Sequence, residues 1–205
     1  MTVTRRQMVC GAAIAPVALG ACTSLLGPGA SAARDGTIML PTVGDEAEFF
    51  AKCIRCFRCA EVCTTGCIEF HPFWAAPELA GTPYIRPRVA GCNTCMRCTQ
   101  VCPTGALTPT SEEPAVVLEE IDMGKAYVDK GLCLSFIGRV CGVCHDACPY
   151  PAEAIHLRGA AKPEVMEGCV GCGRCEERCP QVPAAIRVFR EDPGVRWMGP
   201  EEWSE

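Results

Sequence analysis

The sequence predicts an α+β fold built from similar modules in tandem, with pseudo-two-fold symmetry. Two observations support this prediction. A run of cysteines with the spacing C-x2-C-x2-C-x3-C recurs along the chain, which has 205 residues and 19 cysteines. After a run, the chain shows a turn and then a short apolar stretch typical of a strand, as at Ile68-Glu69-Phe70, Ile155-His156-Leu157 and Ile186-Arg187-Val188. Self-similarity of this kind indicates one structural unit that is used several times.

Sixteen of the cysteines fall into four motifs. They are Cys53, Cys56, Cys59 and Cys63 in motif 1 (53–63); Cys92, Cys95, Cys98 and Cys102 in motif 2 (92–102); Cys133, Cys141, Cys144 and Cys148 in motif 3 (133–148); and Cys169, Cys172, Cys175 and Cys179 in motif 4 (169–179). Motif 3 departs from the spacing, because Gly138 stands where its first cysteine is expected. Cys133, five residues upstream, is the natural replacement.

This spacing is typical of bacterial [4Fe–4S] ferredoxins. The first three cysteines can hold one corner of a cubane from a tight loop. The fourth follows a short helical turn and binds the other cluster of a pair. We therefore expect bacterial-ferredoxin-like modules whose small cores are organised by four [4Fe–4S] clusters, with the sixteen motif cysteines as ligands.

Two other uses of cysteine fit the pattern less well. Structural zinc prefers two separated pairs of ligands around one ion. A disulfide scaffold suits exported chains, but closely spaced triplets pair poorly without strain and the number of cysteines is odd. Four copies of the cluster motif in one short chain favour iron–sulfur clusters over both.

The composition narrows the classes of partner. Acidic residues (24) outnumber basic ones (19), which gives a net charge of −5. An acidic protein is a poor nucleic-acid binder and suits redox partners with basic docking surfaces. Metal binding supplies folding free energy in small modules of this kind, so we expect the apo-protein to fold poorly.

The N-terminus is predicted to be an export signal. Arg5 and Arg6 precede an apolar, alanine-rich run over residues 8–21, the layout of a twin-arginine (Tat) signal. The run is short for a transmembrane helix. Because the twin-arginine route carries folded proteins, it suits a protein whose clusters are assembled in the cytosol, and it places the mature chain in the periplasm.

The sequence offers two alternatives for the position at which the signal ends. Leu19-Gly20-Ala21-Cys22 resembles a lipobox, which would attach a lipid anchor to Cys22, whereas Ala30-Ser31-Ala32 resembles an ordinary cleavage site. We expect signal and tether over residues 1–33 and a four-cluster domain over 34–205. The Gly/Pro/Ala-rich composition extends the expected tether, Thr23–Pro41, into that domain.

Further elements are expected around the motifs. Residues 45–52 are predicted to form a short helix, residues 115–121 a short helix or strand, and residues 126–129 a strand. Two inserts, 71–89 and 112–129, are expected to shield the clusters from water or to dock partners.

The remaining cysteine of the domain and the three histidines are not needed as ligands. Cys67 corresponds in the repeat to Ala106, so we expect a small buried residue, with a spare ligand as the alternative. We expect His71, His145 and His156 to be surface or supporting residues, and His145 could donate to a cluster sulfur.

The chain resembles the exported four-cluster ferredoxin-type proteins of periplasmic nitrate reductase and methylamine utilisation systems, the NapG/MauM type. The resemblance rests on Arg5-Arg6, Gly81-Thr82-Pro83-Tyr84, residues 123–129, and the long first gap of motif 3 before Cys141-Gly142-Val143-Cys144. It implies electron transfer from a membrane quinol-oxidising iron–sulfur subunit to a periplasmic reductase or small redox protein. The alternatives are an accessory or maturation ferredoxin for a periplasmic amine dehydrogenase and an iron–sulfur subunit of another dehydrogenase or hydrogenase complex.

No nucleophile–base pair, phosphate-binding loop or dinucleotide motif is evident, so we expect a redox subunit without an active site of its own. The resemblance also implies a nested pairing of motifs, first with fourth and second with third. Cys179 would then complete the first triplet, Cys63 the fourth, Cys148 the second and Cys102 the third. Linear distance alone permits consecutive pairing as well.

Overall fold

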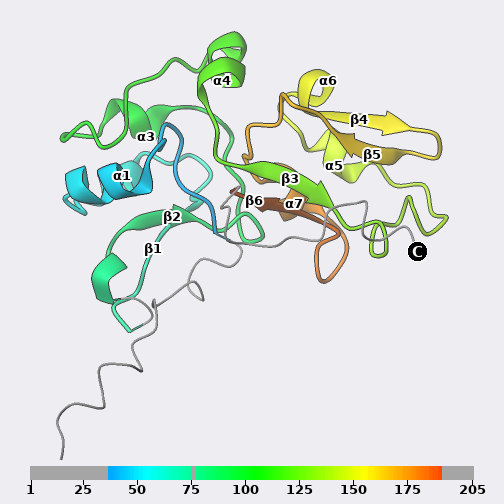
Figure 1. Ribbon diagram of the computed structural model, residues 1–205, viewed down its shortest axis with the longest axis horizontal. Helices are drawn as coiled ribbons and strands as arrows, with labels where there is room; N and C mark the ends of the chain where they lie inside the picture. The colour runs from blue at the N-terminus through cyan, green and yellow to red at the C-terminus, as the bar shows by residue number, and fades with distance from the viewer. Residues whose placement is uncertain (1–36, 75–76, 191–205) are drawn as a thin grey trace, which may run out of the picture. The chain divides into compact units, whose positions relative to one another are not determined.

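The structure, a computed structural model, describes residues 37–74 and 77–190 (Figure 1). The predicted twin-arginine signal, Cys22, the two alternative cleavage sites and the boundary at residue 33 lie outside these residues. Within them, none of the helices has both the length and the apolar character that crossing a membrane requires.

The elements are short and alternate between helix and strand. Three antiparallel pairs of strands are formed by β1 (Ile68–Phe70) with β2 (Pro83–Ile85), β3 (Lys125–Val128) with β6 (Ile186–Phe189), and β4 (Ile155–Arg158) with β5 (Lys162–Val165). The predicted strands at 68–70, 126–129, 155–157 and 186–188 are thus confirmed within a residue of their ends. Motif 2 is the exception, because the chain at 105–113 forms neither helix nor strand.

Short helices carry the third cysteine of each motif toward the fourth. They are α2 (Arg58–Glu61), α3 (Arg97–Gln100), α5 (Val143–Asp146) and α7 (Arg174–Arg178). The expected turn between the third and fourth cysteines is therefore present in all four motifs. The remaining helices are α1 (Glu46–Lys52), α4 (Pro114–Glu120), α6 (Pro151–Ala154) and the 3-10 turn η1 (Pro77–Leu79).

The predicted helix over residues 45–52 is confirmed as α1. Asp45 is its N-cap, and the carboxylate of Asp45 accepts a hydrogen bond of 2.8 Å from the backbone N–H of Glu48. This bond satisfies a donor that the first turn of a helix leaves free. Phe49, on the inner face, is buried. The segment 115–121, for which helix and strand were both possible, is the helix α4.

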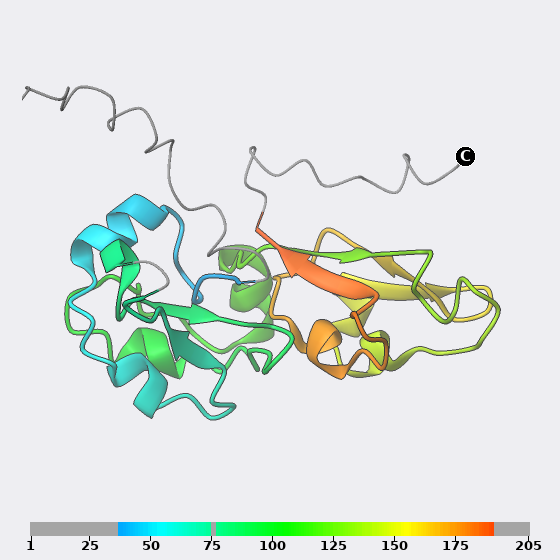
Figure 2. The ribbon, with the colours of Figure 1, turned by 90° about the horizontal axis from the view of Figure 1, so that it is seen from below.

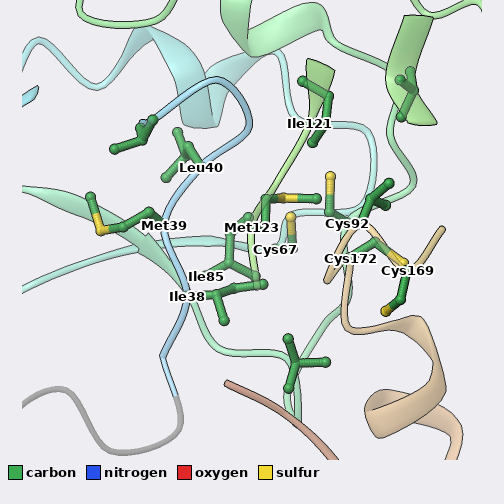
Figure 3. Packing of buried hydrophobic residues seen from close by; sticks show 14 of the residues in the cluster. Ile38, Met39, Leu40, Cys67, Ile85, Cys92, Ile121, Met123, Cys169 and Cys172 are labelled. Atoms are coloured by element: carbon green, nitrogen blue, oxygen red, sulfur yellow. The ribbon is translucent and has the colours of Figure 1, made fainter. Parts of the chain in front are cut away.

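The tether prediction is wrong for its last residues. Ile38 exchanges two backbone hydrogen bonds of 2.8 Å with Ile85, and the side chains of Ile38 and Leu40 are 1% and 0% exposed. Figure 3 shows both side chains packed in the core with Ile85 and Met123. The apolar run Ile38-Met39-Leu40 gains more from burial than the neighbouring glycines and prolines lose by being ordered.

For description we divide the domain into a first half (37–121) and a second half (122–190). In each half a hairpin follows the first motif of that half, β1–β2 and β4–β5. The second half also has the β3–β6 pair, and β3 lies against β5 (Figures 1 and 2). Residue Ile38 forms a single bridge to β2 instead. The strand arrangements therefore differ, and exact pseudo-two-fold symmetry stays a prediction.

Candidate metal centres

The cysteine loops of motifs 1, 2 and 4 share one backbone conformation. The residues immediately before and after the second cysteine have positive φ angles: Arg55 (57°) and Phe57 (64°), Thr94 (56°) and Met96 (51°), and Gly171 (71°) and Gly173 (80°). Positive φ costs a residue other than glycine about 1–2 kcal/mol. Strained backbone of this kind concentrates at functional sites, and here it wraps each loop around the space between its cysteines.

Centre 1 joins motif 1 to the last cysteine of motif 2. A hollow of about 390 Å³ is lined by Cys53, Cys56, Cys59 and Cys102. Apolar side chains, including Phe49 from α1, Pro83 from β2 and Leu107, form much of the rest of its wall, together with Arg55, Arg58 and Thr104. The insert 71–89 therefore does contribute cover, because β2 lies within it.

Centre 2 is built from the other cysteines of the same two motifs, Cys92, Cys95 and Cys98 with Cys63. The hydroxyl oxygen of Thr64, next to Cys63, lies 3.7 Å from the sulfur of Cys95. Burial and the neighbouring thiols of Cys59, Cys95 and Cys63 raise the pKa of Cys98. The second triplet therefore faces the last cysteine of motif 1, as the first triplet faces the last cysteine of motif 2.

Centre 3 joins motif 4 to the last cysteine of motif 3. A hollow of about 310 Å³ is lined by Cys148, Cys169, Cys172 and Cys175. Tyr150, Ile155 and Val188 complete the wall. The first three cysteines of motif 4 are buried, so this centre is well separated from solvent.

Centre 4 contains the irregular motif 3. A hollow of about 330 Å³ is lined by Cys133, Cys141, Cys144 and Cys179. Cys133 thus lies beside Cys141 and Cys144, as a replacement for the cysteine absent at Gly138 would have to, and its role as a ligand stays a prediction. The turns after Cys133 bring it back toward Cys141, because its carbonyl accepts from the N–H groups of Phe136 and Ile137.

The nested pairing implied by the resemblance is wrong. Cys102 lies with the first triplet, where nesting requires Cys179, and Cys179 lies with Cys133, Cys141 and Cys144. The pairing is consecutive, motif 1 with motif 2 and motif 3 with motif 4. The physical reason is local packing: the β1–β2 and β4–β5 hairpins fold each second motif directly back onto the motif before it.

The environment of the sulfurs suits thiolates bound to iron. Burial raises the pKa of Cys98 and of Cys172 to about 12, and that of Cys59 to about 11. Without a bound cation, burial therefore disfavours the thiolate form of these three side chains. Backbone N–H groups supply part of the support: Thr94 donates to Cys92 at 3.3 Å, Leu107 to Cys102 at 3.4 Å and Ala185 to Cys179 at 3.3 Å.

Cys102 is the exception among the thiols. Burial acts to raise its pKa, but hydrogen bonds from the backbone of Leu107, Thr104 and Ala106 and from the Thr104 hydroxyl together lower it. Bonds of this kind to cluster sulfurs also tune the reduction potential. The turn after motif 2 thus donates hydrogen bonds to the sulfur of Cys102, which lies at centre 1.

The described cysteines show neither disulfides nor a compact site for a single ion. In the described part of the chain, all cysteines from Cys53 to Cys179 are free thiols rather than disulfides. Over the same residues, no three Cys, His, Asp or Glu side chains converge closely enough for a single metal ion. The thiols line hollows instead, as ligands of a cubane must.

The histidines lie outside the linings of the three hollows. His145 pairs with the carboxylate of Asp146 at 3.3 Å, and not with a cysteine sulfur as was considered possible. His156 interacts with the backbone oxygen of Ala152 at 2.7 Å, and the ring of His71 lies 4.3 Å from that of Tyr84. Cys67 is buried as predicted.

The two halves meet between centres 2 and 3. The N–H of Cys92 donates to the carbonyl of Cys172 at 2.7 Å, and the hydroxyls of Thr94 and Tyr150 lie 2.8 Å apart. Figure 3 shows Cys92 and Cys172 on facing segments of the core. The guanidinium of Arg88 donates to the carbonyls of Glu176, Cys179 and Gln181 at 2.9–3.0 Å. We call this contact region the junction.

Sequence reasoning missed several residues of this region. No role was predicted for Arg88, which lies in the insert 71–89, or for Tyr150. Glu176 is buried within α7, where burial raises the pKa of its carboxyl group, and this group accepts a 2.7 Å hydrogen bond from the N–H of Val188. The only signal for Tyr150 was its place directly after Cys148-Pro149.

Comparison with known proteins agrees with these centres. Two models described as 4Fe-4S dicluster domain match residues 52–106 and 125–180. Each match contains two motifs, as consecutive pairing requires. The methylamine utilization ferredoxin-type protein MauM of Methylophilus methylotrophus is 34% identical over 80% of this chain and 75% of its own length. The ferredoxin-type protein NapG of Haemophilus influenzae is 31% identical over 82% and 64%.

The chain belongs to the NapG/MauM family of ferredoxin-type proteins. MauM of Paracoccus denitrificans gives a similar match, 32% identical over 75% of this chain and 71% of that protein. As a NapG/MauM-type protein, the chain consists of two tandem 4Fe-4S dicluster domains and is an iron–sulfur electron-transfer protein. The cysteines would hold the clusters, which supply one-electron chemistry, while the chain positions and insulates them.

Proposed function

We propose that the protein holds four [4Fe–4S] clusters, one in each centre, through the sixteen motif cysteines, and relays electrons in the periplasm. The donor is a membrane quinol-oxidising iron–sulfur subunit, and the acceptor is a periplasmic oxidoreductase such as nitrate reductase. The observation that carries this proposal is the grouping of four cysteines at each centre. Membership of the NapG/MauM family supports it.

The order of the centres gives a path for the electrons. Centres 1 and 2 share motifs 1 and 2, and centres 3 and 4 share motifs 3 and 4. The junction brings Cys92 of centre 2 against Cys172 of centre 3. The order is therefore centre 1, centre 2, centre 3, centre 4, with centres 1 and 4 at the two ends.

Both end centres lie beside exposed apolar side chains. Ile54 and Phe57, which flank the exposed Cys56 of centre 1, are 64% and 47% exposed. Val140, adjacent to Cys141 of centre 4, is 79% exposed, and Val182 is 88% exposed. Exposed apolar side chains often mark protein contacts. The two ends are thus the docking positions for donor and acceptor.

The periplasmic location rests on the sequence. The twin-arginine pattern at Arg5-Arg6 indicates export. The lipobox-like sequence at Cys22 indicates a lipid anchor, as the alternative to ordinary cleavage of the signal. Either form leaves residues 34–205 outside the cytoplasm.

A second candidate role is as an accessory ferredoxin in the maturation of a periplasmic amine dehydrogenase. The observation that favours it is the methylamine utilization name carried by several relatives. This role uses the same four centres and differs in the electron acceptor.

Reduction by membranes tests the proposed function. The anaerobically purified protein, mixed with membranes containing the quinol-oxidising subunit and quinol, should show reduced-cluster EPR signals, and addition of the reductase with nitrate should remove them. As a genetic control, deletion of the gene should lower quinol-dependent reductase activity and leave amine dehydrogenase mature. Loss of mature amine dehydrogenase with unchanged reductase activity would favour the second role.

A further inference from the structure

Cys67 is a fifth sulfur at centre 2. It precedes β1, its side chain is 3% exposed, and its sulfur lies 3.6 Å from the sulfur of Cys63. Its side chain also interacts with that of Cys92, and Figure 3 shows these two cysteines as neighbours in the core. Cys67 therefore touches two of the four cysteines of centre 2 without belonging to the motifs.

Cys67 is not needed as a cluster ligand at centre 2. A [4Fe–4S] cluster takes four thiolates, and centre 2 already has Cys63 and the first three cysteines of motif 2. Cys63 corresponds to Cys102, which lines centre 1 in the same place. Ala106, four residues after Cys102, carries no sulfur at the position of Cys67. Centre 1 is therefore a neighbouring centre of the same design that lacks the extra thiol.

A buried thiol beside a ligand thiolate can donate a hydrogen bond to it. A neutral S–H is a weak hydrogen-bond donor, and the sulfur of Cys63, once bound to iron, is an acceptor within reach. Reduction adds negative charge to the cluster and to its sulfurs. A donor to a ligand sulfur stabilises the reduced form more than the oxidised form, so it raises the reduction potential.

We propose that the Cys67 thiol donates a hydrogen bond to the ligand sulfur of Cys63 and raises the reduction potential of centre 2. This inference rests on the proposed four-cluster function. Centre 2 adjoins the junction. Because its reduction potential is raised, centre 2 holds the electron before the transfer to centre 3 in the second half.

The test is an EPR-monitored redox titration of the full chain with the substitution Cys67→Ala. Iron content should stay at that of the wild type, one midpoint potential should fall, and the other three should not move. Cys67→Ser keeps a donor and should lower the potential less. A variant with Cys63, Cys92, Cys95 and Cys98 all replaced by alanine should lack the signal that shifts, which assigns the shift to centre 2.

Ala106→Cys is the converse experiment. It places a thiol at the corresponding position of centre 1 and should raise the potential of that centre. Two results would overturn the inference: four unchanged potentials in Cys67→Ala, or loss of about four irons in that variant, which would make Cys67 a ligand. Failure of the proposed function is distinguishable, because the wild type itself would then lack four clusters.

Discussion

Replacing Cys53, Cys56, Cys59 and Cys102 together by alanine is expected to remove one cluster and leave three. All four cysteines line centre 1, so the variant loses about four irons. The other twelve motif cysteines keep their partners. Iron analysis and EPR of the protein purified without oxygen measure this loss directly.

The matched control exchanges one residue. In the variant with Cys53, Cys56, Cys59 and Cys179 replaced by alanine, centre 1 is lost and centre 4 loses one ligand. Two clusters should therefore be affected, although the number of cysteines removed is the same. Nested pairing demands the opposite result, with two clusters affected in the first variant and one in the control.

Gly171→Ala is expected to destabilise the holo-protein strongly. A Cβ atom at this position would lie 2.4 Å from the carbonyl oxygen and 2.6 Å from the nitrogen of Gly124. These are backbone atoms, and the adjacent hydrogen bond from Met123 N–H to the Val170 carbonyl holds the two segments together. The φ angle of 71° adds strain for alanine. Together, overpacking and strain cost about 2–5 kcal/mol.

Gly105→Ala separates these two effects. Its φ angle is 67°, and a Cβ atom there would meet nothing within 4 Å. It should therefore cost only the strain, about 1–2 kcal/mol. The measurement is the urea concentration at which the iron–sulfur absorption bleaches, compared for wild type and both variants. Equal sensitivity of the two variants would show that the close approach of Gly171 to Gly124 is unimportant.

The local features could be predicted from the sequence because they depend on neighbouring residues. The helix over residues 45–52, the strand at Ile68 and the expected use of Cys133 in place of the cysteine absent at Gly138 follow from spacing and short-range chemistry. The positive φ angles of Arg55 and Thr94 could not be predicted from these residue types alone. The corresponding position in motif 4 is Gly171, so the internal repeat contained the information.

The long-range features could not be derived in this way. Cys102 and Cys179 are both compatible with the first triplet in linear distance, and the choice depends on the hairpin that folds motif 2 onto motif 1. The segment 38–41 was assigned to the tether on its Gly/Pro/Ala-rich surroundings, although its apolar side chains favour burial. The contacts of Arg88 and Tyr150 at the junction depend on packing between the halves.

The most direct test is a count of iron and acid-labile sulfide per chain after anaerobic purification, with the cluster type established by Mössbauer spectroscopy. Four occupied centres require about sixteen irons and about sixteen sulfides, all as [4Fe–4S] clusters. A colourless protein that contains zinc, or a preparation that reaches only about eight irons when fully reconstituted, would contradict the assignment of one cluster to each centre.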